Sequence, residues 1–377
     1  MRTDLAVLTI LALAMLGWLG WQTREDTPER GAIGLGDVLG EAPEHFRRVT
    51  GPEPLEFPAD HAAHPDYRSE WWYFTGNLDA DDGRRLGFQF TLFRFALDSP
   101  QTVDSAWATD SLWMAHLALS DGRQQRFYQS ERFARGAQGL AGADRDRWWL
   151  RDWRVERRES GWHFEARAEN FGLALNLVPE RPIVFQGERG YSRKGPEPGN
   201  ASRYYSLTRL RAEGTASLDG ASVAVDGLAW LDREWGSNQL SDDLAGWDWF
   251  ALQLEDGRDV MVYRLRHPDG RASSYSAGIV VEPDGSSRAL EAEDFEATVE
   301  RRWRDEQGHE WPLDWRLKVA PAGLDLRVEP IFDNQRWTGS VDYWEGAMDV
   351  FDAETGKRLG RGYLELSGYG DRRAATR

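Results

Sequence analysis

Two stretches of the sequence place carboxylates among aromatic side chains. They are residues 69–73 (SEWWY) and 229–236 (AWLDREWG), and a further WDW follows at 247–249. Successive residues of a strand point to opposite faces, so Trp230, Asp232 and Glu234 should share one face. Burying such acids costs several kcal/mol unless they are paired. Arg233 lies on the other face, so the partner must come from elsewhere: Arg94, Arg209 or Arg264.

An acid at the end of an aromatic cavity could act as a proton donor. Desolvation raises the pKa of a carboxyl group, and ring faces stabilise a nearby cation. We expect Asp232 to be the acid, with Glu234 or His116 handling water. The candidate ligand-binding residues are Glu70, Trp71, Trp72, Tyr73, Trp230, Trp235, Trp247, Trp249 and Tyr263.

A structural alternative stays open for these residues. Glu70 or Asp232 could cap a turn or hold an arginine at a seam between domains, with the rings only packing. His116 lies in the apolar stretch 113–121 and is either a core histidine or a base at the cavity wall.

Other catalytic motifs are absent from the sequence. It has no nucleophile elbow, P-loop, dinucleotide-binding glycine pattern or HExxH, and Ser192 does not match the elbow spacing. His61 and His64 lack a visible third ligand, so we expect them to be solvent-exposed loop residues. We expect no metal and no cofactor.

Composition narrows the function classes further. The net charge is −17, which argues against a nucleic-acid partner. Mean hydropathy is −0.63, which argues against a multi-span membrane protein. Cysteine is absent, so thiolate chemistry is excluded. The 19 tryptophans bring a large apolar area and many N–H donors that need partners.

Residues 60–371 show the pattern of an antiparallel β protein. Apolar residues alternate at 86–92, 162–168 and 171–177, and Asp-Gly pairs lie between several such runs. Beyond the N-terminus, the best helical pattern is Ala289–Phe295. We therefore predict an all-β fold of two tandem lipocalin-like barrels or sandwiches.

The N-terminus has the features of an export signal. Arg2 precedes the apolar run Leu5–Trp21, and no small-residue cleavage site follows. We predict a signal peptide or membrane anchor at 1–22 and a linker at 23–59. The expected location is the periplasm or cell envelope, with membrane contact through the N-terminal segment.

A faint internal duplication divides the body in two. Phe74–Leu78 matches Phe250–Leu254, and Trp230-Leu231-Asp232 matches Tyr363-Leu364-Glu365. In this comparison Glu213 corresponds to Glu345. We predict domains at 60–236 and 237–371 and a tail at 372–377. The Pro/Gly-rich stretch 179–199 is either a loop inside the first domain or the linker.

The sequence resembles the hydroxyneurosporene synthase (carotenoid 1,2-hydratase, CrtC-like) family, and most closely its secreted AttH-like branch. The resemblance rests on residues 69–76, 115–121, 230–236, 343–346 and 362–369. It implies two lipocalin-like β domains. For the hydratases it implies addition of water to a terminal isoprenoid double bond. For the secreted branch it implies a predicted hydrolase or a protein associated with an ABC transporter permease.

Two functions follow as hypotheses. The first is an exported protein that binds a hydrophobic lipid or isoprenoid. The second is a cofactor-free hydratase, a hydro-lyase that adds water to an isoprenoid C=C bond by acid catalysis. Whether the protein is an enzyme stays open. The deciding feature is whether a cavity reaches Asp232 and Glu234.

Overall fold

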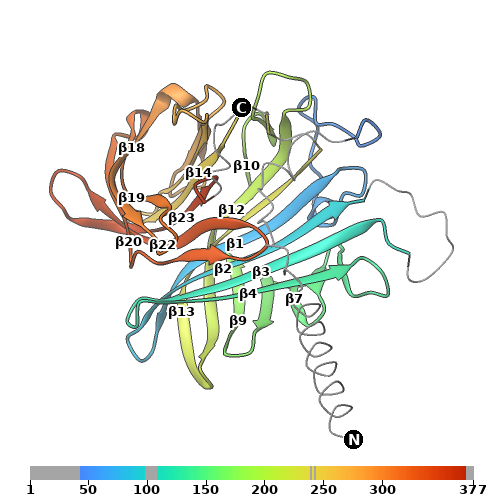
Figure 1. Ribbon diagram of the computed structural model, residues 1–377, viewed down its shortest axis with the longest axis horizontal. Coiled ribbons are helices and arrows are strands. Elements are labelled where there is room, and N and C mark those ends of the chain that lie inside the picture. The colour runs from blue at the N-terminus through green and yellow to red at the C-terminus, as the bar shows by residue number, and fades with distance from the viewer. Residues whose placement is uncertain (1–42, 98–107, 238–239, 242, 371–377) are drawn as a thin grey trace, which may run out of the picture.

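The computed structural model describes residues 43–97, 108–237, 240–241 and 243–370, and its strands form two antiparallel sheets (Figure 1). The all-β prediction is confirmed. In these ranges the helical elements are three short 3-10 turns, η1 (Ala59–His61), η2 (Ala292–Asp294) and η3 (Ala320–Ala322). The signal or anchor at 1–22, much of the linker and the tail at 372–377 lie outside the described residues.

The first sheet has 13 strands. β10 (Val184–Phe185) and β11 (Tyr191–Arg193) both pair with β12. The other strands follow one another across the sheet in the order β4 (Arg126–Arg135), β3 (Ser111–Asp121), β2 (Arg85–Ala96), β1 (Ser69–Ala80), β13 (Ala221–Gly236), β12 (Ala201–Leu218), β9 (Phe171–Pro179), β8 (Gly161–Arg167), β7 (Trp153–Arg158), β6 (Arg147–Leu150) and β5 (Ala141–Ala143).

The second sheet has 10 strands and is drawn in yellow to red in Figure 1. β21 (Arg336–Thr338) pairs with β22. The remaining order is β17 (Ser287–Leu290), β16 (Ala277–Val281), β15 (Asp259–Arg266), β14 (Gly246–Leu254), β23 (Arg358–Ser367), β22 (Asp342–Asp352), β20 (Leu324–Pro330), β19 (Glu310–Val319) and β18 (Phe295–Arg304).

Two details of the sequence interpretation change. The helical pattern at Ala289–Phe295 is wrong: Leu290 ends β17 and pairs with Gly278 of β16, and only the short turn η2 follows. The stretch 179–199 contains β10 and β11, which extend the first sheet along β12. No helix in the described part of the chain has both the length and the hydrophobicity needed to cross a bilayer.

Side chains on the two faces of β1 enter different cores. The first sheet curls until β6 contacts β2, β3 and β4, and Trp72 and Phe74 point into its interior. Tyr73 and Trp71 point the other way and pack in a separate cluster with side chains of the second sheet, such as Trp249. The alternation along one strand therefore builds both the barrel core and the seam between the sheets.

Strand registers support the internal duplication. Tyr73 of β1 lies opposite Asp232 of β13, and Trp249 of β14 lies opposite Glu365 of β23. Across the next pairing, Ser206 opposes Asp232 and Glu345 opposes Glu365. Asp232 and Glu365 therefore occupy equivalent places in the two halves.

The expected match of Glu213 with Glu345 is wrong. Glu213 opposes Asp226 near the far end of the long β12–β13 hairpin, whereas the register gives Glu345 the counterpart Ser206. Beyond Ser206 the β12–β13 ladder continues for 12 residues to Leu218, whereas beyond Glu345 the β22–β23 ladder continues for six residues to Phe351, so counting back from the turns misaligns the halves.

Candidate functional site

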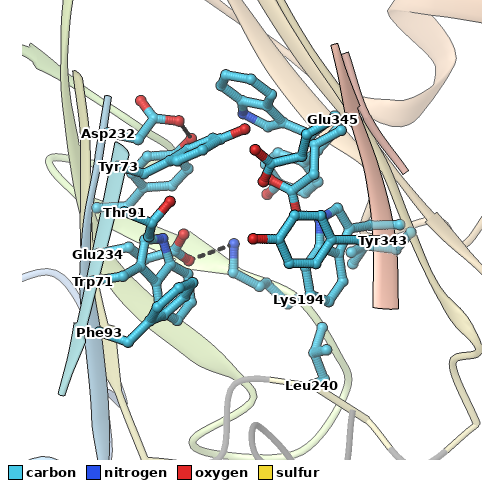
Figure 2. A pocket seen from close by; sticks show the side chains of 16 residues that line it. Trp71, Tyr73, Thr91, Phe93, Lys194, Asp232, Glu234, Leu240, Tyr343 and Glu345 are labelled. Carbon is cyan, nitrogen blue, oxygen red and sulfur yellow. Dashed lines mark hydrogen bonds and ion pairs between the residues drawn. The ribbon is translucent and has the colours of Figure 1, made fainter. Parts of the chain in front are cut away.

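A cavity lies at the seam between the two sheets (Figure 2). It contains about 750 Å³ of space between protein atoms, with its open mouth included. Its walls come from β1, β2, β12 and β13 of the first sheet and from β14, β15, β22 and β23 of the second, with Lys194 and Leu240 from connecting segments. The cavity is therefore outside the interior of the first barrel, in a position that neither sheet could form alone.

The duplicated strands supply equivalent residues to opposite walls. The registers of β1 with β2 and of β14 with β15 make Trp71 equivalent to Trp247 and Tyr73 equivalent to Trp249. Thr91 and Phe93 correspond in the same way to Tyr263 and Leu265, and Tyr204 corresponds to Tyr343. The result is a mostly aromatic enclosure.

Asp232 is held by three donors on the cavity wall. The Tyr204 hydroxyl donates to Oδ2, while Ser206 Oγ and Trp230 Nε1 donate to Oδ1 at 2.5 and 2.7 Å. Burial raises the pKa of Asp232 to about 6, against the lowering effect of these hydrogen bonds. The carboxyl group is thus oriented firmly and titrates just below neutrality.

Glu234 finds its partner in Lys194, two positions beyond Ser192. The Lys194 ammonium lies 2.7 Å from Glu234 Oε1, and Ser202 also donates to that oxygen. Burial lowers the pKa of Lys194, but Glu234 outweighs this and the net pKa is raised. The prediction that Arg94, Arg209 or Arg264 pairs with these acids is wrong, because those arginines bind Glu70, Asp259 and Asp248.

Two further carboxyl groups face each other on the second sheet. Glu345 and Glu365 are direct neighbours across β22 and β23, and both line the cavity. Glu345 is buried, Glu365 is partly exposed, and Trp247 Nε1 donates to Glu365 Oε1 at 2.8 Å. Glu345 Oε2 and the nearby Tyr73 hydroxyl are buried without a hydrogen bond.

This carboxyl pair holds a proton at neutral pH. Burial raises the pKa of Glu365 to about 7, and the charges of Asp232 and Glu234 add to the effect. Burial and the facing Glu365 raise the pKa of Glu345 well above its usual value. Two close carboxylates cannot both ionise cheaply, so the pair is a proton reservoir inside an aromatic cavity.

His116 lies behind the cavity wall. Its Nδ1 accepts or donates at the hydroxyl of Tyr343, which lines the cavity, and its Nε2 lies 3.0 Å from Glu131 Oε2. The ring stacks on Trp337 with centroids 4.2 Å apart. His116 therefore reaches the cavity through Tyr343.

Glu70 belongs to a structural ion cluster away from the cavity. Its carboxylate binds Arg233 and, at 2.9 Å, Arg94. Burial alone would raise the pKa of Glu70, but Arg233 leads the charges and hydrogen bonds that lower it to about 2. Arg233 lies over the rings of Trp72 and Trp235, at 3.8 and 4.8 Å from their centroids.

The predicted residues thus separate into four groups. Glu70, Trp72 and Trp235 surround Arg233, and Trp230 lies beside Asp232 on the same face of β13 and donates a hydrogen bond to it. His116 does not line the cavity but hydrogen-bonds to Tyr343, which does. The predicted residues that line the cavity are Trp71, Tyr73, Asp232, Glu234, Trp247, Trp249 and Tyr263.

The sequence interpretation missed Lys194, Glu345, Glu365 and Tyr343. A signal for Glu365 was present, because the duplication equates it with Asp232.

The expectation for the loop histidines is wrong: His61 is buried and hydrogen-bonds to Tyr205 at 2.6 Å, and His64 is partly buried. Across the described ranges, no three His, Asp or Glu residues are grouped closely enough to hold a metal ion.

The sequence pattern of the AttH-like family matches residues 48–369. The chain belongs to the AttH-like family. Its fold is similar to that of a protein assigned as AttH from Nitrosomonas europaea, with 34% identity, a TM-score of 0.78, and coverage of 86% of this chain and 100% of the other. No match was found among curated proteins.

Two more distant structures share the fold of this AttH-like protein. Kievitone hydratase from Nectria haematococca is 15% identical, with a TM-score of 0.62 and coverage of 87% of this chain and 98% of that one. CghA, solved with Sch210972, is 12% identical, with a TM-score of 0.51 and coverage of 88% and 99%. At these identities the likeness concerns the fold.

Proposed function

We propose that this AttH-like protein is a cofactor-free hydro-lyase that adds water to an electron-rich C=C bond of an apolar, isoprenoid-type molecule. The observation that carries the proposal is the Glu345–Glu365 pair, which retains a proton at neutral pH within aromatic walls. An acid in such a place can protonate an alkene, because it keeps its proton at neutral pH and lies beside the aromatic walls against which an apolar molecule would bind.

The walls suit the cation that this step forms. Protonation of a trisubstituted alkene gives a tertiary carbocation, and the aromatic rings of Tyr73, Trp71 and Trp249, which line the cavity, can stabilise it. Ionised Asp232 adds a negative charge held in place by three hydrogen bonds. Water then attacks the cation, and loss of one proton gives the tertiary alcohol.

The comparison with kievitone hydratase is consistent with this reaction class, since that protein's name describes addition of water. The identity is too low to carry the activity across, so the support comes from the cavity itself. The acid assigned by sequence, Asp232, is reassigned here to a stabilising role. Its three donors favour the carboxylate form, whereas the Glu345–Glu365 pair favours the protonated form.

The test is a hydration assay in ¹⁸O-labelled water. A prenylated phenol and lycopene serve as probes, and a product one labelled water heavier than the probe is the expected result. Glu365→Gln and Glu345→Gln should each lower kcat about 10²–10⁴-fold, the usual range for general acid catalysis. Glu354→Gln, exposed at the turn of the same hairpin, is the control and should match wild type.

The pH dependence provides a second criterion. The acid must be protonated, so activity should fall as pH rises through about 7, the pKa of Glu365. Wild-type protein that converts neither probe under these conditions contradicts the proposal. Full activity in both Gln variants contradicts the assignment of the acid.

Binding without turnover is the second candidate function. The observation that favours it is the aromatic enclosure itself, formed jointly by both sheets. The same probes should quench the fluorescence of Trp71 and Trp247 in the Glu365→Gln variant. Binding by wild type with no labelled product would favour a lipid or isoprenoid carrier. For such a carrier we also propose a location in the cell envelope and an association with an ABC transporter.

A further inference from the structure

A chain of three polar groups leads from the cavity toward solvent. Tyr343 of β22 hydrogen-bonds through its hydroxyl to His116 Nδ1 on β3, and His116 Nε2 lies 3.0 Å from Glu131 Oε2 on β4. The Glu131 side chain is 20% exposed, whereas His116 is fully buried. Tyr343 comes from the second sheet and the other two from the first, so the chain crosses the seam.

Each proton in this chain has a defined place. Burial and the nearby Glu345 and Glu365 raise the pKa of Tyr343 well above its usual value, so the phenol keeps its proton. Burial lowers the pKa of His116 despite the opposing effect of Glu131, which favours the neutral ring. Tyr343 O–H therefore donates to Nδ1, and Nε2–H donates to Glu131.

The Tyr343 oxygen keeps its acceptor capacity for the cavity. Its only proton is directed to His116, and Figure 2 shows the hydroxyl end of Tyr343 among the cavity side chains. An oxygen with this polarity accepts a hydrogen bond from water. Tyr204, the equivalent residue of the other half, instead donates its hydroxyl proton to Asp232.

We propose that Tyr343, His116 and Glu131 form the base side of the reaction and take the proton from the attacking water. This inference rests on the proposed hydration. It identifies the base that accepts the proton of water, a role that the Glu345–Glu365 acid pair does not fill. Tyr343 is the catalytic residue that touches water. His116 and Glu131 are positioning residues that act through it.

The step balances in protons and electrons. A water O–H bond breaks as its oxygen forms the C–O bond to the cation, and that proton passes to the Tyr343 oxygen. The phenolic proton moves to His116 Nδ1, which leaves a neutral tyrosine and an imidazolium. Glu131 stabilises the imidazolium, and the excess proton leaves to solvent through the exposed edge of the Glu131 side chain. The Glu345–Glu365 pair regains a proton from solvent through the open cavity.

The pKa of His116 depends on the few groups that contact its ring. Glu131 from β4 and Tyr343 from β22 are its polar neighbours, and Phe93 and Trp337 contribute apolar rings. Ser340 holds the Glu131 carboxylate through its hydroxyl, which donates to Oε2, and through its backbone N–H, which lies 3.1 Å from Oε2 and 3.3 Å from Oε1. Burial alone would raise the pKa of Glu131, but His116 and Ser340 lower it, which keeps this group an acceptor.

The experiment combines variants with a pH profile in the labelled-water assay. Tyr343→Phe and His116→Gln should lower kcat about 10²-fold or more with little change in KM. Glu131→Gln should shift the acidic limb of kcat/KM to lower pH, because Glu131 raises the pKa of His116. His163→Gln is the control: His163 is partly buried on β8, where it contacts Asn176, and should behave as wild type.

A second readout does not depend on turnover. Long-range ¹⁵N–¹H NMR of ¹⁵N-histidine-labelled protein should show His116 as the neutral Nε2–H tautomer. Hydration that persists within about threefold in Tyr343→Phe overturns the relay while the proposed function stands. A protonated Nδ1 overturns it whatever the activity. Absence of hydration by wild type ends the proposed function, and the base assignment with it.

Discussion

At the scale of single residues, Glu70 and the facing pair Glu345–Glu365 have opposite electrostatic surroundings. Glu70 is surrounded by cations, and its pKa falls to about 2. Within the described part of the chain, Glu345 and Glu365 have no ion-pair partner and face each other, so their pKa values rise. Glu70 therefore stabilises the fold. The Glu345–Glu365 pair instead holds a proton, and its ionisation at high pH lowers the stability of the folded protein.

Replacement of Glu70 should therefore destabilise the protein. Glu70→Gln leaves Arg233 and Arg94 buried without their anion, which costs about 3–5 kcal/mol in the free energy of unfolding. Urea denaturation at pH 7 measures the change. The exposed Arg47–Glu53 pair is the control, and Glu53→Gln should change stability by less than about 1 kcal/mol. Equal effects of the two substitutions would contradict the structural role of Glu70.

Replacement of Glu365 should stabilise the protein at high pH. Its folded-state pKa of about 7 lies above the ordinary 4.5, so its contribution is present below pH 4.5 and is lost as pH rises through 7. Glu365→Gln should therefore be more stable than wild type at pH 8. Because Glu365 is partly exposed to the cavity, we expect a gain of about 2 kcal/mol, less than the full pKa shift implies.

Urea denaturation of both proteins at pH 5 and pH 8 checks this prediction. The wild type should lose stability between these values relative to the variant. An identical pH dependence in the two proteins would show that Glu365 has an ordinary pKa.

At the scale of elements, the cavity depends on how closely β2 approaches β22. A Cβ atom on Gly87 would come within 2.4 Å of Ala347 Cβ, so the absence of a side chain permits this contact between the sheets. Arg85 of β2 also donates to the backbone carbonyl of Met348 at 2.8 Å. Strand β22, which carries both Tyr343 and Glu345, is thus held against the first sheet by a short contact.

Gly87→Ala should push these strands apart. We expect a loss of about 1–3 kcal/mol, the usual range for overpacking, and weaker binding of the isoprenoid probe. Thermal unfolding and the fluorescence titration measure the two effects. Gly51→Ala is the matched control, since no atom lies within 4 Å of the added methyl group. Unchanged stability and binding in Gly87→Ala would contradict the proposed contact.

At the scale of the whole molecule, the seam joins the two sheets into one unit. Arg209 of β12 makes two hydrogen bonds of 2.6 and 3.0 Å to Asp259 of β15, and Thr208 donates to the same carboxylate. Arg361 of β23 binds Asp79 of β1 at 2.7 and 2.8 Å. Each pair joins a strand of the first sheet to a strand of the second.

Loss of Asp259 should weaken the whole protein. Asp259→Asn leaves Arg209 without its anion at the seam, and we expect a loss of about 3 kcal/mol. Calorimetry should show one transition for wild type and a lower Tm for the variant. Asp325→Asn removes an exposed pair with Arg316 inside one sheet and should cost less than about 1 kcal/mol. Two separate transitions in wild type would contradict a single cooperative unit.

Local features of the sequence determined the class of fold. Alternating apolar residues and Asp-Gly turns act over a few neighbours, so they predicted the antiparallel strands and the shared face of Trp230, Asp232 and Glu234. The duplication was also visible, because both halves keep the same strand and turn pattern. The registers then placed Asp232 and Glu365 at equivalent positions.

Tertiary structure decided which of these residues meet. Lys194 reaches Glu234 from a segment 40 residues away, and Arg233 contacts Glu70 across 163 residues, so no local pattern distinguishes the two acids. His116 and Tyr343 are 227 residues apart and belong to different sheets. The cavity exists only where two independently patterned sheets pack together, and that packing depends on side-chain fit across the seam, which periodicity along one strand does not encode.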